Sequence, residues 1–421
     1  MPRSTKKNLL KRFFSVLGPG LITGAADDDP SGIVTYSIAG AQLGTGLLWT
    51  AFITWPLMAF VQFMCARIGM VTGMGLGYSL RRKGPPWLLL IGAVGLLIAN
   101  TINVGSDLSG MADAAEMLTG IKSQLYVFVF GAAIMYATVR FRYYQIAMVM
   151  KWLAAVLFAY VITAFIAQPD WAKVLRDTFV PTWPENHGAW QNLVAILGTT
   201  ISPYLFFWQA SQEVEEEKAM GRRLLVQREG ATKREIIDRK LDVGVGTFFS
   251  NFVMYFIILT TAMVLHKHGM TRIDSSRQVA EALRPLAGAL ASLLYTIGII
   301  GVGFLAIPTL AGSAAYAFAE TFRWRQGLDR PLRGAHHFYA VLIFSMLVGI
   351  ALDFLKVNPI GALFWTAVIN GVLAPFLLVG ILLVASDRKL MNDQPSSWLS
   401  RAVVGLTAAL MFIAAGAMFF L

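Results

Sequence analysis

The chain has 421 residues, of which 56% are hydrophobic and only 14% are charged, and its mean hydropathy is +0.61. Soluble domains carry about 25% charged residues, so this composition argues against a large soluble enzyme and favours a membrane protein. The net charge of +11 does not indicate nucleic-acid binding, because the basic residues lie between apolar stretches and not along one stripe.

Eleven apolar stretches are long enough to be membrane spans, which predicts an all-α polytopic membrane protein. We expect one membrane transport domain over the whole chain, 1–421, opening with a cytoplasmic N-terminal segment, 1–16. The eighth span contains Pro308, which predicts a kink or a tilt, and the fourth and ninth are short enough for one to be re-entrant. The predicted spans are 17–40, 47–70, 87–118, 124–139, 144–167, 190–213, 243–265, 285–319, 338–353, 360–385 and 400–420.

Basic residues are concentrated in alternate connections, which predicts a cytoplasmic N-terminus and an external C-terminus. The protein is expected in the plasma (inner) membrane of a bacterium. The longest hydrophilic connection, about 215–242, is predicted to be a solvated helical linker without a fold of its own. The expected cytoplasmic clusters are the N-terminal one, Arg81-Arg82-Lys83, Arg140 with Arg142, the stretch from Lys218 to Lys240, the stretch from Arg323 to Arg333, and Arg388-Lys389.

The first span is interrupted near its middle by the sequence Asp27-Asp28-Asp29-Pro30, followed by Gly32. Proline removes a backbone donor and clashes with the preceding turn, and glycine tolerates irregular backbone. Carboxylates at membrane depth are costly unless they face water, protein or a bound cation. Together these features predict an unwound segment that lines a cavity.

The sixth span has a similar interruption, Ser202-Pro203-Tyr204, close to Gly198. Two interrupted helices five spans apart indicate an inverted repeat with the binding site between them. The repeats would be 17–167 and 190–385, and 400–421 would be an added helix. The alternative is that each proline only kinks a continuous helix, which explains Pro203 better than Pro30.

An unwound turn frees backbone carbonyls, which together with a carboxylate suit a hard cation. Asp29, directly before the proline, is the first candidate ligand. Adjacent helical residues point about 100° apart, so the three aspartates face one site only if the backbone is irregular. Asp107, in the middle of the third span, belongs either to an ion or proton path or to a structural hydrogen bond. The candidate metal-site residues are Asp29, Ser202, Ala26, Thr199, Gly32 and Asp28, and the path candidates are Asp27, Asp107 and Tyr204.

No methionine or cysteine stands at either interruption, and the five histidines fall in loops or at span edges. Carboxylate, carbonyl and water ligands suit Mg²⁺, Ca²⁺ and Mn²⁺, whereas soft ligands select softer metals. Mg²⁺ often keeps part of its hydration shell, so a roomy pocket beside Ser202 and Gly32 would suit a hydrated Mg²⁺.

The segment GPG…DPSG…AGAQLG resembles the first helix of the Nramp divalent-metal transporters, whose pattern is GPG…DPGN…AGAQ. The resemblance implies the LeuT-type fold of that family, with helices 1–5 and 6–10 as inverted repeats and helices 1 and 6 broken. Three further segments are similar to the second, third and tenth helices of the family: Gln62…Ala66-Arg67-Ile68-Gly69…Val71-Thr72-Gly73, Ser106-Asp107-Leu108, and Ser386-Asp387-Arg388-Lys389-Leu390-Met391.

The chain departs from the family pattern at the site itself. Asp29 is kept, but Gly32 stands where the family has asparagine, and Ser202-Pro203-Tyr204 replaces Met-Pro-His. Gly110 stands where the third helix usually has glutamate. These changes resemble the divergent Nramp-related branch associated with magnesium transport, and they imply weak or absent proton coupling.

Two other transport functions and one enzymatic function compete with this hypothesis. The chain could instead be a proton-coupled Mn²⁺/Fe²⁺ importer with a reshaped site, or a sodium-coupled organic-solute symporter on the same fold. A membrane enzyme is disfavoured, since no nucleophile–base pair or histidine-rich metal motif lies at membrane depth. The expected partners are the substrate ion, Mg²⁺ or Mn²⁺, and the lipid bilayer, with no cofactor, nucleic acid or obligate protein partner.

Overall fold

The computed structural model describes residues 18–142, 145–146, 148, 155–184, 186–328, 330–355 and 358–420. Over these residues the chain forms helices joined by loops and no strand. Eight stretches are long and apolar enough to cross a membrane, and the first of them, Pro30–Thr72, contains two successive helices. The N-terminal segment 1–16 and part of the predicted fifth span lie outside the described residues.

The helices follow the predicted spans closely. The first half contains α2 (Pro19–Asp27), α3 (Pro30–Leu43), α4 (Leu48–Thr72), α5 (Leu76–Lys83), α6 (Pro86–Thr119), α7 (Ser123–Arg140), α9 (Phe158–Ile166) and α10 (Trp171–Phe179). The second half contains α11 (His187–Thr200), α12 (Pro203–Ala219), α13 (Leu225–Arg228), α14 (Lys233–Val264), α15 (Ser276–Glu281), α16 (Arg284–Ala287), α17 (Ala291–Phe322), α18 (His336–Asp353), α19 (Pro359–Ala385) and α20 (Trp398–Phe420). Short 3-10 turns occur at Gly44–Leu47, Ala155–Leu157, His266–His268, Gly288–Leu290 and Leu332–Gly334.

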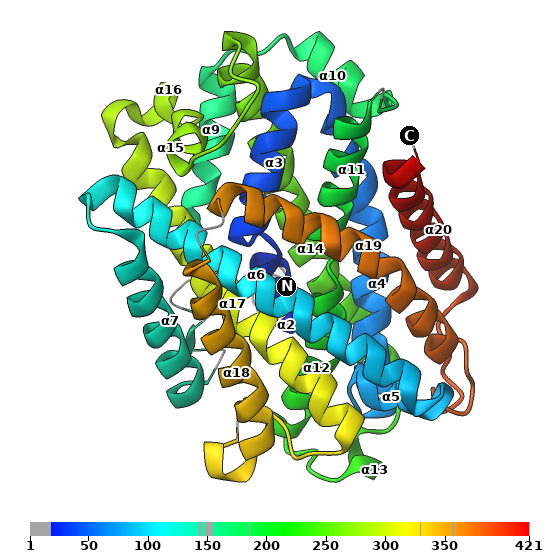
Figure 1. Ribbon diagram of the computed structural model, residues 1–421. Helices are drawn as coiled ribbons and strands as arrows, with labels where there is room; N and C mark the ends of the chain where they lie inside the picture. The colour runs from blue at the N-terminus through cyan, green and yellow to red at the C-terminus, as the bar shows by residue number, and fades with distance from the viewer. Residues whose placement is uncertain are drawn as a thin grey trace, which may run out of the picture.

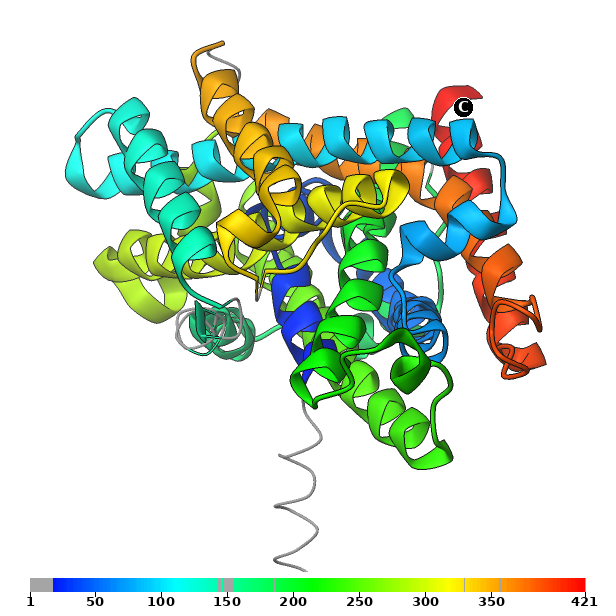
Figure 2. The same ribbon diagram turned by 90° about the horizontal axis from the view of Figure 1, so that it is seen from below.

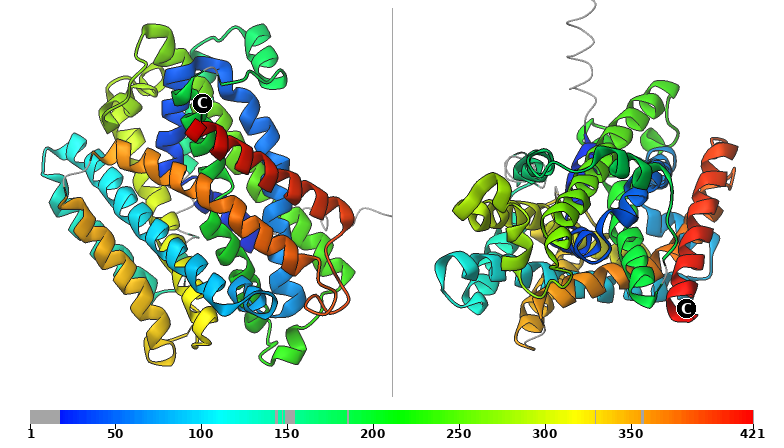
Figure 3. Two further views of the ribbon diagram at one scale, coloured as in Figure 1. Left: turned by 45° about the vertical axis from the view of Figure 1, so that its right-hand side comes forward. Right: turned by 90° about the horizontal axis from the view of Figure 1, so that it is seen from above.

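The broken helices lie at the centre of the bundle. In Figure 1, α6 and α19 cross the front of the molecule diagonally, and α2, α3 and α12 lie behind them. Figure 2 shows the same layering from below, with α6 and α19 along one side. The added helix α20 runs along the outer side of α19 (Figure 3). The centre of the bundle is therefore walled by α6, α14, α17 and α19, which pack against the broken segments.

Both predicted interruptions are real breaks and not simple kinks. α2 ends at Asp27, and α3 restarts at Pro30 with Asp29 as its N-cap residue. α11 ends at Thr200, and α12 restarts at Pro203. Proline suits the first position of each new helix because its fixed φ is helical and its missing N–H would have no partner there. Pro308, by contrast, lies inside the continuous helix α17.

Two glycines allow the broken helices to lie directly on their neighbours. A Cβ atom at Gly24 of α2 would lie 2.3 Å from the carbonyl oxygen of Gly246 in α14. A Cβ atom at Gly198 of α11 would lie 2.1 Å from the carbonyl oxygen of Ala367 in α19. Small residues allow such close backbone approach between membrane helices, so each half-helix is placed by backbone contact.

The connection at 215–242, predicted to be a solvated linker, is exposed over much of its length, but it also contains buried charged residues. α12 and α14 both extend into it, and Arg239 and Asp242 of α14 are buried. The Arg239 guanidinium pairs with Glu213 (Nε–Oε2 2.7 Å), with Asp242 (Nη1–Oδ2 2.6 Å) and with Glu216. Buried charges require partners, so the mixed Arg/Glu content of this segment reflects an ion-pair network between helices.

The same network holds the beginning of α2. The carboxylate of Asp242 accepts hydrogen bonds from the backbone N–H groups of Gly18 (2.8 Å), Gly20 (2.7 Å) and Leu21 (3.0 Å). A carboxylate at a helix N-terminus satisfies free donors and complements the helix dipole. The first half of the broken helix is therefore tied at its start to α14.

Candidate metal-binding site

The two breaks face each other across the centre of the molecule. The Tyr204 hydroxyl of α12 donates to the carbonyl oxygen of Ala26 in α2, with an O–O distance of 3.2 Å. On the other side, the hydroxyl oxygen of Thr199 lies 3.1 Å from the position that a Cβ atom would take at Gly32. The structure thus brings together residues of α2, α3, α11 and α12 that the sequence placed in one site.

Asp29 has the position expected of the principal ligand. It is 1% exposed, and its Oδ1 accepts from the backbone N–H of Gly32 at 2.6 Å, as the N-cap of α3. Its Oδ2 accepts from the side-chain amide of Asn103 in α6 at 3.3 Å. Each carboxylate oxygen can accept more than one bond, so these contacts orient Asp29 and leave acceptor capacity for a cation.

Thr199 and Ser202 supply uncharged oxygens from the second break. The Ser202 hydroxyl donates to the carbonyl oxygens of Thr199 (2.6 Å) and Gly198 (2.9 Å). Its proton is therefore directed toward the backbone, and its lone pairs remain for another partner. The Thr199 hydroxyl oxygen is buried and has no hydrogen-bond partner among the described residues. An unpaired buried oxygen is costly, so Thr199 is suited to a ligand.

Asp27 and Asp28 are drawn toward α14. The Ser250 hydroxyl lies 2.6 Å from Oδ2 of Asp27 and 3.3 Å from Oδ1 of Asp28. Asp28 also lines a cavity of about 290 Å³ bordered by Gly24, Phe158 and Ser250, among others. These two side chains form a second acidic cluster, and the irregular backbone at the break lets them diverge from Asp29.

The third helix contributes two buried polar residues. Asn103, which binds Asp29, was not among the predicted site residues. Asp107 interacts electrostatically with Asp29 and with the backbone of Ser31, but neither of its carboxylate oxygens has a hydrogen-bond partner within the described parts of the chain. Asn100, Asn103 and Asp107 are spaced by three and four residues, which puts them on one helix face. This polar stripe was the signal that could have identified Asn103.

The donor set favours a hard cation held by few ligands. Carboxylate, hydroxyl and carbonyl oxygens surround the break, and these are the donors that Mg²⁺, Ca²⁺ and Mn²⁺ accept. No group of three or more His, Cys, Asp or Glu side chains arranged to hold a metal ion occurs in the described ranges.

Comparison with known families and sequences finds relatives over most of the chain. The family described as "Natural resistance-associated macrophage protein-like" (Nramp) matches residues 20–421. A "Divalent metal cation transporter MntH" from Caldanaerobacter subterraneus subsp. tengcongensis is 27% identical, over 99% of this chain and 96% of that protein. Another protein of the same description, from Mesorhizobium japonicum, is 25% identical over 91% of this chain and 83% of its own length.

Solved structures show the same fold. The Eremococcus coleocola manganese transporter, in complex with an aromatic bis-isothiourea substituted compound, aligns with a TM-score of 0.75 at 16% identity, over 99% of this chain and 89% of that chain. MHP1, a nucleobase-cation-symport-1 family transporter, aligns with a TM-score of 0.58 at 15% identity, covering 96% and 90% of the two chains. At such identities the likeness concerns the fold alone, and the predicted LeuT-type architecture is confirmed.

Proposed function

Since the chain belongs to the Nramp family and is a divalent metal cation transporter, not an enzyme, we propose that its preferred ion is Mg²⁺. Mn²⁺ is accepted as well, and transport is weakly or not coupled to protons. The observation that carries this proposal is the oxygen-only donor set at the break, built from Asp29, Thr199 and Ser202. None of these three residues carries a thioether, so they lack the soft ligand that would select softer ions over Mg²⁺.

A partly hydrated ion is part of this proposal. The packing beside Gly32 is tighter than the roomy pocket expected from the sequence, since a methyl group there would lie 3.1 Å from the Thr199 hydroxyl oxygen and 3.3 Å from the Asp29 carboxylate. Mg²⁺ usually retains several waters and binds through one or two carboxylates. Asp29 would bind the ion directly or through water, with Ser202 and the carbonyls of Ala26 and Thr199 completing the shell.

Weak proton coupling is supported by two positions. At Gly110 of α6, a Cβ atom would lie 2.8 Å from Leu363 of α19, so the space is already filled by an apolar side chain. Tyr204 directs its hydroxyl to the Ala26 carbonyl, and a phenol does not titrate near neutral pH as an imidazole does. Neither position offers the acid or histidine that a proton relay would use.

A proton-coupled Mn²⁺ or Fe²⁺ importer is the second candidate. It is favoured by the MntH relatives and by Asp107, a buried acid without a hydrogen-bond partner in the described structure. The organic-solute symporter has only the fold likeness to MHP1 behind it, and membership of the Nramp family argues against it.

Uptake into proteoliposomes with dyes for the metal and for internal pH tests the proposal. We expect entry of Mg²⁺ and Mn²⁺, inhibition of Mn²⁺ entry by excess Mg²⁺, and no acidification that tracks metal entry. Mn²⁺ entry that is insensitive to Mg²⁺ would exclude Mg²⁺ as the ion. Acidification proportional to uptake would establish the proton-coupled importer instead.

We also propose the domain plan and orientation that accompany this function. The single transport domain would comprise repeats at 17–167 and 190–385 and an added helix at 400–421. It would lie in a bacterial inner membrane with the N-terminus inside and the C-terminus outside. The close contact of two predicted cytoplasmic connections, through Lys83 and Asp387 (Nζ–Oδ2 2.6 Å), supports their placement on the same side of the membrane.

A further inference from the structure

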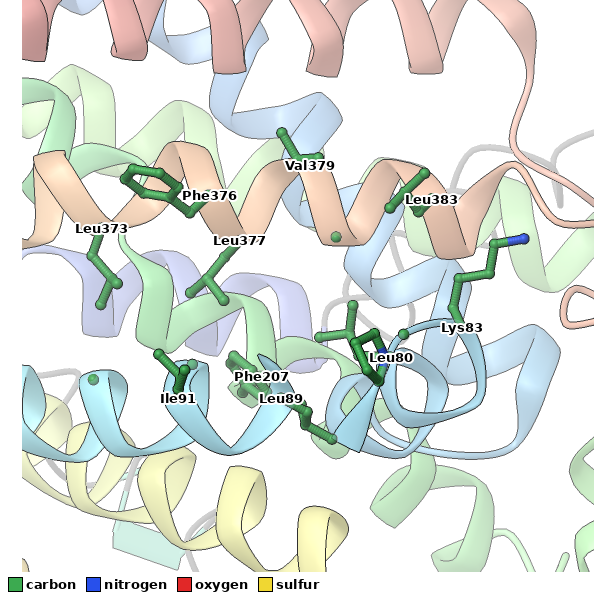
Figure 4. A pocket seen from close by; sticks show the side chains of 15 residues that line it. Leu80, Lys83, Leu89, Ile91, Phe207, Leu373, Phe376, Leu377, Val379 and Leu383 are labelled. Atoms are coloured by element: carbon green, nitrogen blue, oxygen red, sulfur yellow. The ribbon is translucent and has the colours of Figure 1, made fainter. Parts of the chain in front are cut away.

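A deep apolar groove lies between α6 and α19, away from the ion site. Its volume is about 550 Å³, within the range of about 300–1,000 Å³ typical of small-molecule sites. Leu373 and Leu377 of α19 point toward Ile91 of α6, and Lys83 lies at one end (Figure 4). Lys83 is the only charged residue among those that line the groove.

The groove is open along one side and closed at its floor. The rim residues Ile91 and Phe376 are 60% and 62% exposed, whereas Leu377 and Phe207 below them are buried. Since α6 and α19 are among the helices apolar enough to cross a membrane, the open side faces the hydrocarbon of the bilayer. A long, apolar and flexible ligand from the bilayer fits this shape.

The charged end of the groove indicates which bilayer molecule it suits. Lys83 and Arg82 are exposed at the end of α5, and Arg388 and Lys389 are exposed just after α19. The contact between Lys83 and Asp387 brings the two basic segments together. Lys83 has three donors and uses one of them on Asp387, so it keeps donors for a second anion. Four basic side chains against one acid favour a negatively charged headgroup.

We propose that this groove binds one acyl chain of an anionic phospholipid, with the headgroup phosphate against Lys83 and the neighbouring basic side chains. Trp87, which is 62% exposed near this end, suits the headgroup level, where tryptophan is enriched. The lipid acyl chain would reach Phe207 on α12, which lies five residues after Ser202 of the second break. A bound lipid would therefore stabilise the position of α12, which lines one side of the ion site.

Two glycines in the floor of the groove allow it to be filled without disturbing the helices. Cβ atoms at Gly92 and Gly95 would lie 3.8 Å from the nearest leucine methyl groups of α19, an ordinary contact distance. Leucine at both positions would occupy the space of the acyl chain. Gly416 of α20 is a matched control, because a Cβ atom there meets nothing within 4 Å.

Native mass spectrometry of the purified transporter, after exposure to phosphatidylglycerol or phosphatidylcholine, tests the proposal. The wild type and Gly416→Leu should retain one phosphatidylglycerol in preference to phosphatidylcholine, and Gly92→Leu/Gly95→Leu should lose it. Lys83→Gln should weaken retention about fivefold, the effect expected of one basic side chain at an anionic surface. Lys267→Gln, exposed in another connection, should have no effect.

Three results would overturn the proposal. Equal retention by the wild type and the groove-filled variant would show that the lipid binds elsewhere. Equal retention of both lipids by the wild type would remove the role of the basic end. A dimer that forms without retained lipid would show that a second copy of the chain covers the groove. If the filled variant does not fold, Lys83→Gln still decides the matter, and the readout is independent of metal transport.

Discussion

Asp29 combines a structural and an ionic role in one side chain. It caps α3 through Gly32 and presents a carboxylate between the two breaks. Loss of an N-cap alone costs about 0.5–2 kcal/mol, so Asp29→Ala changes both stability and charge. Asparagine caps a helix as well as aspartate does, and Asp29→Asn therefore isolates the charge.

We predict that both Asp29→Ala and Asp29→Asn abolish metal uptake, because each removes the carboxylate that lies at the break between α2 and α3. Thermal melting in detergent should show a loss of stability for the alanine variant and little change for the asparagine variant. Uptake by Asp29→Asn at the wild-type rate would mean that the ion is held by other groups.

Ser202 is the position at which ion selectivity can be changed. Its hydroxyl proton is directed to backbone carbonyls, so the oxygen is free to face an ion. Ser202→Met should shift preference toward Mn²⁺ and Cd²⁺ at the expense of Mg²⁺, since a thioether favours softer ions. Competition uptake with the three ions measures this shift, and an unchanged series would place residue 202 outside the ion shell.

Individual site residues could be predicted from the sequence where the conformation depends on neighbouring residues in the chain. Asp29-Pro30 and Ser202-Pro203 were predicted as breaks because proline at each position is joined by polar residues and a nearby glycine. Proline alone does not break a helix, since Pro308 lies inside the continuous helix α17. Asn103 was missed because its role depends on how α6 faces α3, which a single helix pattern does not determine. The divergence of Asp27 and Asp28 toward Ser250 depends likewise on the position of α14.

At the scale of elements, α2 is held at both ends by different means. Its C-terminal end is joined to α12 by the contact of Tyr204 with Ala26. Its beginning is held by the carboxylate of Asp242 in α14, which also pairs with Arg239. Release of this half-helix from α14 would require the loss of these hydrogen bonds.

We predict that Asp242→Asn loosens α2, because hydrogen bonds to a charged group contribute about 1.5–3 kcal/mol. A cysteine placed at Leu21 should then react faster with a water-soluble thiol reagent. Asp238→Asn is the control, since Asp238 lies on the same helix and its ion pair with exposed Arg234 is long, at 3.8 Å. Equal labelling rates would show that α2 does not depend on Asp242.

The buried network around Arg239 also shows that charge content alone does not predict whether a segment is exposed to solvent. The stretch at 215–242 was predicted to be a solvated linker, and much of it is exposed. Charged residues of α12 and α14 nevertheless pair with one another across a buried interface. Sequence alone gives the charges of each segment but not which helices they bring together.

For the whole molecule, orientation in the membrane is the main untested prediction. A cysteine at Lys389 should be protected from an impermeant maleimide in intact cells, whereas one at Lys122 should react, because basic connections remain in the cytoplasm. Both lysines are exposed, and the native Cys65 is fully buried, which limits background labelling. The opposite pattern of labelling would reverse the orientation.

The LeuT-type fold was predictable because the bilayer requires apolar helices long enough to cross it. Within the described residues eight stretches meet that requirement, against the eleven spans predicted. What could not be predicted is the packing between helices, such as the groove between α6 and α19. Its existence depends on Gly92 and Gly95 lying opposite leucines of α19, a register that no single helix specifies.

The buried acids at the centre of the molecule have a consequence for the return half of the transport cycle. The donors that lie next to these acids are uncharged. They are a hydroxyl group, a side-chain amide and backbone N–H groups, and they surround Asp27, Asp28, Asp29 and Asp107. After the metal has left, a carboxylate of this group that stays ionised has no cationic partner among the described residues, and reorientation across the hydrocarbon becomes slow. One-for-one exchange avoids that step, so unlabelled metal on the far side should accelerate entry of labelled metal by counterflow.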